Sequence, residues 1–280
     1  MRTRINIGKV LISTVLAIVL CACGGQPSPK GQPQQQAETA LVQTEKPKPK
    51  AEKPKQTSTQ KKKADKPKMV RLTEDNVVEE LTKYGRQNPE KRVRIITSMG
   101  TMVVELYDNT PLHRANFIHL IKEHYYDGTE FYRVINNFMI QGGDTDGYER
   151  RAVKEKIGKY TLPSEFREEN IHKRGALSMV REYENNPEKR SSPFEFFIVQ
   201  GTTYTDGELN GTEFNYNVKI SPEHRAVYKS EGGCAYLDGQ HTVFGEVVEG
   251  LEVIDKIAAV KTGQGDWPLE AVTIKMEIVK

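Results

Sequence analysis

The sequence predicts a mainly β protein, a closed antiparallel barrel with helices at its ends, preceded by an N-terminal tether without stable structure. Two observations carry this prediction. From residue 92 onward, short runs rich in β-branched residues recur, with few helical patterns and no strand–helix alternation. Between residues 23 and 70, by contrast, almost nothing is apolar, so this part of the chain cannot offset the entropy lost on ordering.

Charge is divided unevenly along the 280 residues, although Lys+Arg 41 against Asp+Glu 38 gives only +3 overall. Residues 1–22 carry +3, residues 23–70 carry +7, and residues 71–280 hold 27 basic against 34 acidic side chains, which gives −7. A basic tether therefore leads into a mildly acidic domain. This balance gives no indication of a nucleic-acid partner.

The first 22 residues are predicted to be a lipoprotein signal peptide. Basic residues precede the apolar run Val10–Leu20, which is about half the length needed to cross a bilayer. Leu20-Cys21-Ala22-Cys23 then resembles the bacterial lipobox, and Cys23 is the expected lipid acceptor because small Ala22 precedes it. A lipidated Cys23 would anchor the protein in the bacterial cell envelope, facing the periplasm. An ordinary secretory signal with incidental cysteines is the alternative.

Residues 23–70 are predicted to be a disordered tether rich in Lys, Pro and Gln. Its Lys-Pro repeats favour extended polyproline II, and repulsion between like charges stiffens the chain. Such a spacer would let a folded domain work at a distance from its lipid. A solvated spacer is favoured over contact between Lys46–Lys68 and anionic headgroups, since runs of charge are usually solvated.

The folded part is expected to begin with a short helical entry segment, residues 71–91. Thr73 or Asp75 would cap an amphipathic helix that runs to about Tyr84 and is ended by Gly85 and Asn88-Pro89.

A hairpin and a helix are expected next. Val93–Thr97 and Thr101–Tyr107 are rich in β-branched residues and are joined by a glycine turn, which is typical of a hairpin. Pro111 then suits the first turn of a helix that carries Phe117, Leu120 and Ile121 on one face.

The remaining elements alternate between short strands and loops. Helices are expected near Pro222–Lys229 and over Leu251–Ala259. Strand-like runs are Glu130–Ile140, Gly175–Val180, Phe194–Val199, Thr242–Val247 and Val272–Val279.

Five blocks of residues carry a resemblance to a known family. They are YDGTEFYRVI at 126–135, FMIQGGD at 138–144, RGALSM at 174–179, FFIV at 196–199 and LDGQHTVFGEV at 237–247. In this order they resemble the cyclophilin peptidyl-prolyl cis-trans isomerases, here in a bacterial lipoprotein form. The resemblance covers about residues 92–280. It implies an eight-stranded barrel capped by two helices, with the active site in a groove on the outer face.

The resemblance also implies catalytic residues and a pocket for proline. Arg133 matches the arginine whose fork of donors holds the substrate carbonyl and reaches the prolyl nitrogen, whose lone pair is freed when amide resonance breaks. Gln141 matches the residue that holds this arginine and the substrate backbone in place. The family's apolar pocket positions are matched by Phe138, Met139, Phe197, Leu237 and His241.

Several substrate-binding positions depart from the family pattern. Glu195 replaces a glutamine that donates its amide to the substrate, and an ionised carboxylate cannot donate. Glu195 would therefore either pair with Arg133 and tighten it or weaken peptide binding. Val180 and Arg181 replace a small residue and an asparagine of the neighbouring pocket, and Tyr236 replaces a tryptophan. Cyclosporin binding is therefore expected to be weak.

These residues predict a peptidyl-prolyl cis-trans isomerase that acts on proline-containing polypeptides and assists protein folding in the bacterial envelope. The alternative is a low-turnover binding module or holdase for Pro-containing segments, with Glu195 as its clue. No cofactor and no metal are expected, because His119 and His124 are five apart rather than four on a predicted helix. The sequence shows no heptad or apolar interface stripe, so we expect a monomer.

Overall fold

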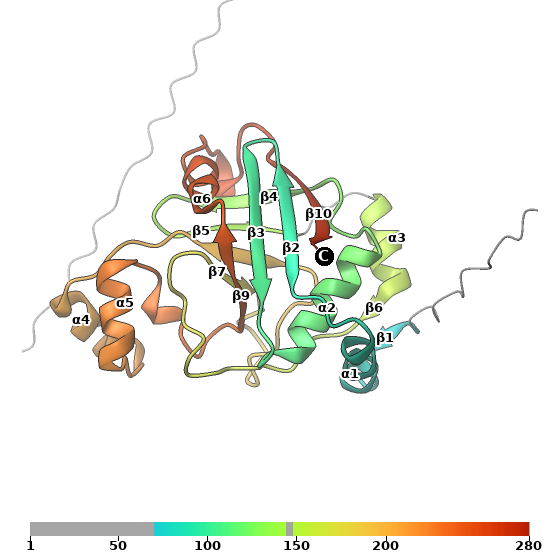
Figure 1. The fold of residues 1–280 in the computed structure, drawn as a ribbon, viewed down its shortest axis with the longest axis horizontal. Helices are drawn as coiled ribbons and strands as arrows, with labels where there is room; N and C mark the ends of the chain where they lie inside the picture. Colours follow the sequence, from blue (N-terminus) through green and yellow to red (C-terminus); the bar gives the residue numbers. More distant parts are fainter. Residues whose placement is uncertain (1–69, 144–147, 280) are drawn as a thin grey trace, which may run out of the picture. The chain divides into compact units, whose positions relative to one another are not determined.

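The computed structural model describes residues 70–143 and 148–279, and its central feature is a closed eight-stranded antiparallel barrel (Figure 1). The predicted fold class is confirmed. Hydrogen-bonded neighbours follow the order β10-β2-β3-β9-β7-β8-β5-β4, and β10 pairs with β4 to close the barrel. The strands are β2 (Arg92–Thr97), β3 (Gly100–Leu106), β4 (Thr129–Ile135), β5 (Met139–Gly142), β7 (Ala176–Met179), β8 (Phe196–Val199), β9 (Val243–Glu249) and β10 (Thr273–Val279).

Helices α2 (Pro111–Lys122) and α6 (Leu251–Ala258) cover the two ends of the barrel (Figure 1). Phe117 of α2 is fully buried and packs against three aromatic rings of the core. Its ring centroid lies 5.1 Å from that of Tyr126, 5.7 Å from that of Phe196 and 5.3 Å from that of Phe244. The helix predicted to begin at Pro111 therefore forms and packs its apolar face against the barrel core.

The entry helix α1 (Val77–Gln87) begins later and ends later than predicted. Asn76, rather than Thr73 or Asp75, precedes it, because the Asn76 side chain accepts from the Thr73 amide at 2.8 Å and closes a turn ahead of the helix. Gly85 does not end the helix. A Cβ on Gly85 would lie 3.1 Å from the Cβ of Ala115, so this glycine lets α1 pack closely on α2.

Two short strands tie this entry segment to the rest of the domain. β1 (Leu72–Thr73) pairs in parallel with β6 (Gly158–Lys159), which directly follows helix α3 (Tyr148–Ile157). Helix α3 was not expected from the sequence, because its residues are mostly charged. Leu72 is fully buried in the main core, so the segment ahead of the barrel is part of the packed domain.

The run Glu130–Ile140, expected as one strand, forms the two strands β4 and β5. The turn between them places Asn137 at φ 64°, a left-handed conformation that asparagine tolerates better than most residues. The amide of Phe138 donates to the carbonyl of Ile135 at 3.1 Å across this turn.

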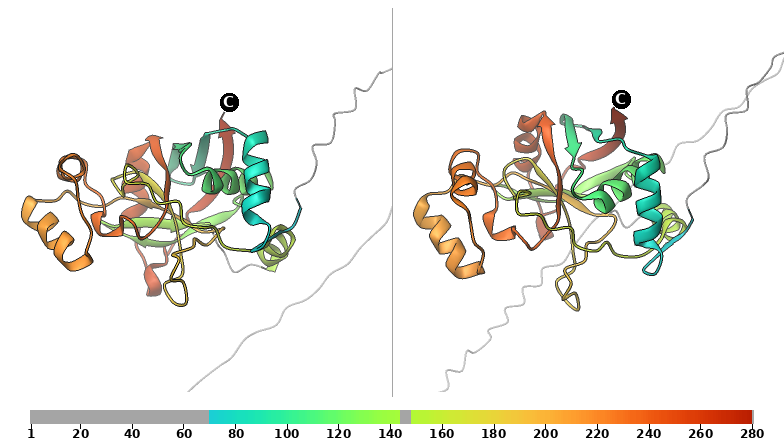
Figure 2. Two further views of the ribbon diagram at one scale, coloured as in Figure 1. Left: turned by 90° about the horizontal axis from the view of Figure 1, so that it is seen from below. Right: turned by 60° about the horizontal axis from the view of Figure 1, so that its bottom comes forward.

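Between β8 and β9 the chain forms an insertion of two helices, α4 (Asp206–Tyr216) and α5 (Pro222–Ser230), which lie together on one side of the barrel (Figures 1 and 2). Only α5 was predicted. The insertion has a small core of its own, in which Leu209, Ile220 and Tyr228 pack with Ala235. Ala235 belongs to the short 3-10 helix η1 (Ala235–Leu237), which connects the insertion to the barrel.

The signal peptide, Cys23 and most of the tether lie outside the described residues, and their predicted roles stay predictions. Within residues 70–143 and 148–279, none of the helices combines the length and apolar character needed to cross a membrane.

Candidate active site

A bulge in strand β4 places two polar side chains on the outer face of the barrel. The register between β4 and β5 shifts between Phe131 and Arg133, while Phe131 and Val134 both belong to the core. Tyr132 and Arg133 therefore both face away from the barrel interior, as expected where a bulge re-aims side chains beside a site. Arg133 pairs across the ladder with Gln141.

A pocket of about 200 Å³ opens beside these residues. Successive side chains of β5 and β8 point to opposite faces of the barrel wall. Ile140, Phe196 and Ile198 point into the main core, while Met139, Gln141 and Phe197 point outward and line the pocket. Among the predicted catalytic and substrate-binding residues, Glu195 and Tyr236 are the two that do not line the pocket. Its lining residues are Arg133, Phe138, Met139, Gln141, Val180, Arg181, Tyr183, Phe197, Leu237 and His241.

Arg133 is held at the rim of the pocket by two partners. Its Nη1 donates to Oε1 of Gln141 at 3.5 Å, and its Nε lies 3.4 Å from Oδ2 of Asp266. The guanidinium remains part of the pocket lining and has further N–H donors.

A chain of hydrogen bonds runs from Glu195 to Arg133. Tyr132 Oη donates to Oε1 of Glu195 at 2.6 Å, and Ser192 Oγ donates to the other carboxylate oxygen at 2.9 Å. Gln141 Nε2 in turn donates to Tyr132 Oη. Because the Tyr132 hydroxyl donates its one hydrogen to Glu195, its oxygen accepts from Gln141. The amide of Gln141 therefore turns its oxygen toward Arg133.

Glu195 does not pair directly with Arg133. The carboxylate is bonded to Tyr132 and Ser192, and the carboxylate paired with Arg133 is that of Asp266. Hydrogen bonds through Tyr132 and Gln141 connect Glu195 to Arg133.

His241 forms part of the apolar wall and is neutral. Burial, with the nearby charge of His172 second, lowers the pKa of His241 to about 4. Its Nδ1 lies 3.1 Å from the carbonyl oxygen of Met179, which can only accept, so Nδ1 carries the proton. Nε2 then accepts from the hydroxyl of Tyr183 at 2.8 Å. The ring packs edge-on to Phe197, with centroids 5.3 Å apart, and its polar atoms are already satisfied.

Arg181 and Tyr183 build the neighbouring wall. The guanidinium of Arg181 lies 4.1 Å from the centre of the Tyr183 ring. Arg181 also donates to the carbonyl oxygen of Gln240 at 2.6 Å and to that of Glu182 at 3.1 Å. These bonds hold the buried arginine as a structural part of the wall.

Besides Tyr132 and Ser192, two further contributors were not predicted from the sequence. Tyr183 lines the pocket and holds His241, and Asp266 pairs with Arg133 from the 3-10 helix η2 (Gln264–Asp266). An isolated aromatic in a charged stretch was the available signal for Tyr183. Asp266 had no comparable signal, because its place depends on a left-handed turn at φ 61°.

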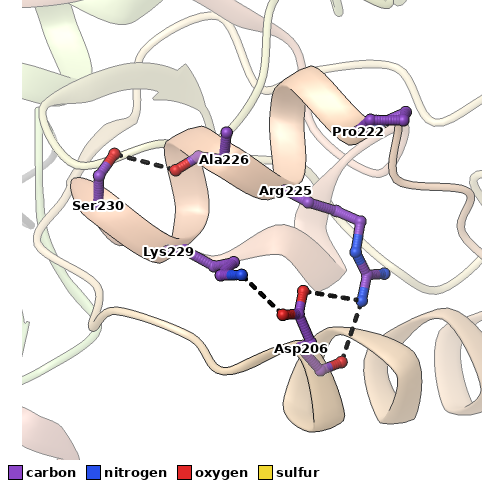
Figure 3. A pocket seen from close by; sticks show the side chains of 6 residues that line it. All are labelled: Asp206, Pro222, Arg225, Ala226, Lys229 and Ser230. Carbon is purple, nitrogen blue, oxygen red and sulfur yellow. Dashed lines mark hydrogen bonds and ion pairs between the residues drawn. The ribbon is translucent and has the colours of Figure 1, made fainter.

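A larger hollow of about 550 Å³ lies between α4 and α5 (Figure 3). Its two cationic side chains, Arg225 and Lys229, both pair with Asp206, at 3.5 Å and 2.6 Å. Because these charges are already paired, the hollow offers a substrate fewer unpaired charged groups. Nor do the described residues contain a group of three or more His, Cys, Asp or Glu side chains placed to hold a metal ion.

Comparison with known proteins identifies the family. Residues 92–278 match the model of the family described as cyclophilin type peptidyl-prolyl cis-trans isomerase/CLD. The chain belongs to this family of cyclophilins. It is therefore a peptidyl-prolyl cis-trans isomerase, and the pocket beside Arg133 is its candidate active site.

Curated relatives agree with this assignment. A Staphylococcus saprophyticus protein named "Putative peptidyl-prolyl cis-trans isomerase" is 34% identical over 207 residues, which cover 71% of this chain and 100% of that protein. A Streptococcus pyogenes protein named "Putative bifunctional phosphatase/peptidyl-prolyl cis-trans isomerase" is 37% identical over 187 residues, which cover 66% of this chain but only 37% of that protein. Among solved structures, a Cryptosporidium parvum cyclophilin is 23% identical with a TM-score of 0.49, covering 68% of this chain and 98% of that one.

Proposed function

We propose that this cyclophilin isomerises X-Pro bonds of proline-containing polypeptides in the bacterial cell envelope, with Arg133 as the catalytic residue. The observation that carries the proposal is the position of the Arg133 guanidinium, oriented by Gln141 and Asp266 at the rim of an apolar pocket.

The chemistry requires a twisted peptide to be bound better than either planar form. The barrier to amide rotation is about 18–20 kcal/mol because the carbon–nitrogen bond must lose its double-bond character. In the twisted state the prolyl nitrogen regains a lone pair, to which an N–H of Arg133 can donate. This interaction exists only in the transition state, so it raises the rate rather than the affinity.

The rest of the pocket would bind the planar and twisted forms alike. Phe138, Met139, Phe197 and Leu237 offer carbon surface to the proline ring, while the polar atoms of His241 are already bonded elsewhere. No group has to gain or lose a proton in the reaction. Isomerisation by this site therefore needs neither a nucleophile nor a metal.

Exchange NMR on an Ala-Pro peptide tests this proposal. With the full chain, purified in detergent, the cis and trans forms of the peptide should interconvert far faster than they do without catalyst, where interconversion takes tens to hundreds of seconds. Binding of the peptide without faster exchange would contradict the proposal and favour the alternative of a holdase.

The envelope location rests on the N-terminal sequence. Cys23 follows a lipobox-like Leu20-Cys21-Ala22, and a Lys/Pro-rich tether then separates it from the barrel. Metabolic labelling with an alkyne fatty acid tests this part. Cys23→Ser should lose both the label and membrane fractionation, whereas Cys21→Ser should keep them. Retained label in Cys23→Ser would contradict lipidation at this cysteine.

A further inference from the structure

A row of three aromatic rings leads from the pocket to the insertion. Phe138 lines the pocket, and its ring centroid lies 6.1 Å from that of Tyr236. Tyr236 is in turn 5.2 Å from Tyr216 on helix α4, with the rings inclined by 32°. Tyr216 is 55% exposed, so the row ends at the surface. We call Phe138, Tyr236 and Tyr216 the aromatic row.

The aromatic row is held firmly against the pocket by η1. The three residues of η1 each contact a different part of the domain. Ala235 packs in the insertion core, Tyr236 contacts Tyr216, and Leu237 lines the pocket. A hydrogen bond of 2.7 Å from Tyr228 of α5 to Asp238 fastens the insertion just beyond η1. The element η1 therefore contacts both the insertion and the pocket.

The two exposed aromatics of α4 differ in direction. Tyr216 follows the buried residues Leu209 and Thr212 at helical spacing, so it lies on the face toward the barrel. Phe214, which is 89% exposed, is two residues earlier and lies on the opposite face. Only Tyr216 continues the surface of the proline pocket.

We propose that the aromatic row is an extension of the proline site that binds an apolar side chain, preferably an aromatic one, of the same substrate polypeptide. This inference rests on the proposed function. Its support is the continuity of the row with the pocket through Phe138, and the exposure of Tyr216 at its far end. Offset or tilted ring contacts favour a further aromatic partner.

The length of the row sets the spacing of that side chain from the proline. The two ring separations, 6.1 Å and 5.2 Å, together correspond to about three residues of extended chain at 3.3–3.6 Å each. The preferred substrates are thus extended segments with an aromatic residue about three positions from a proline.

Peptide affinity tests this inference with the full chain in detergent. The probes are an all-Ala peptide around one Ala-Pro bond and two versions with Phe three positions before or three positions after the proline. One of the two Phe-containing peptides should bind about two- to tenfold more tightly than the all-Ala peptide, which is the range expected for an added aromatic contact. Tyr216→Ala should remove this advantage without changing the affinity for the all-Ala peptide.

Two matched variants distinguish binding at the aromatic row from non-specific binding to any exposed aromatic ring. Tyr216→Phe keeps the ring and should keep the preference, and Phe214→Ala removes an exposed ring from the opposite face and should also keep it. Equal affinity of the wild type for all three peptides, or loss of the preference in Phe214→Ala, would overturn the inference. Exchange rates on the all-Ala peptide test the isomerase separately: absent acceleration with a retained Phe preference would reject the proposed function and leave the row standing.

Discussion

The polar and apolar sides of the pocket are built in different ways. The polar side is a directional chain in which Glu195 orients Tyr132, Tyr132 orients Gln141, and Gln141 faces Arg133. The apolar side is held by packing, with Phe197 in contact with the rings of both His172 and His241. From this difference we predict that the polar side governs the rate, while the apolar side governs affinity.

Removing the arginine is expected to have the largest effect on rate. Arg133→Ala should slow exchange of a bound X-Pro peptide by about 10²- to 10³-fold, the loss typical of one transition-state donor. Exchange NMR gives the rate. Arg94→Ala is the matched control, because Arg94 lies on strand β2 in a surface ion pair with Glu277 at 3.8 Å. An equal loss in Arg94→Ala would remove the special role of Arg133.

Truncating the apolar side should mainly weaken binding. Phe138→Ala removes a half-buried ring from the pocket wall, and peptide affinity should fall about ten- to a hundredfold, corresponding to the burial of one such side chain. Titration followed by NMR gives the dissociation constant. Unchanged affinity would show that proline binds elsewhere.

Disturbing the chain of hydrogen bonds should have a smaller effect. Glu195→Gln lets Tyr132 donate or accept, and Tyr132→Phe removes the link altogether, so Gln141 is free to turn its amide. Exchange of bound peptide should slow about two- to tenfold in either variant, as for the loss of one net hydrogen bond, with affinity unchanged. A drop in affinity with an unchanged rate would place Glu195 in direct contact with substrate instead.

The smallest effect on activity is expected from pH. Since the pKa of His241 is lowered to about 4 and arginine stays charged, exchange rates should be flat between about pH 5.5 and 8. Stability should nevertheless respond. Between pH 6.5 and 4 the unfolded chain protonates this histidine and the folded chain does not, so stability falls as pH falls through that window.

Thermal unfolding at several pH values measures this dependence. His241→Gln should weaken it, although buried His119, whose pKa is also lowered to about 4 by burial, contributes in the same direction. An identical slope in His241→Gln and the wild type would refute the assignment.

The parts of the site on regular strands were predictable from the sequence. The blocks around Arg133, Phe138 and Phe197 lie on or beside β4, β5 and β8, where alternation determines which side chains face outward. The partners of Glu195 were not predictable, since Tyr132 lies 63 residues earlier and meets it only through the bulge.

The insertion was harder still to predict. Helix α4 has a weak apolar pattern, and its start is a capping box between Thr205 and Glu208, which was overlooked. That Tyr216 reaches Tyr236 depends on packing around Ala235, a contact between segments that local sequence does not encode. Local patterns thus predict the barrel and its outward residues, whereas tertiary contacts determine what surrounds the pocket.

Exchange NMR at saturating peptide tests most directly whether the two sides of the pocket have separate roles. The wild type, Arg133→Ala and Phe138→Ala are compared on one Ala-Pro peptide. We predict that Phe138→Ala approaches the wild-type exchange rate once peptide is saturating, while Arg133→Ala binds peptide normally and stays slow at every concentration. Recovery of the wild-type rate by saturated Arg133→Ala would contradict the account, since the arginine would then contribute to binding rather than to the twisted state.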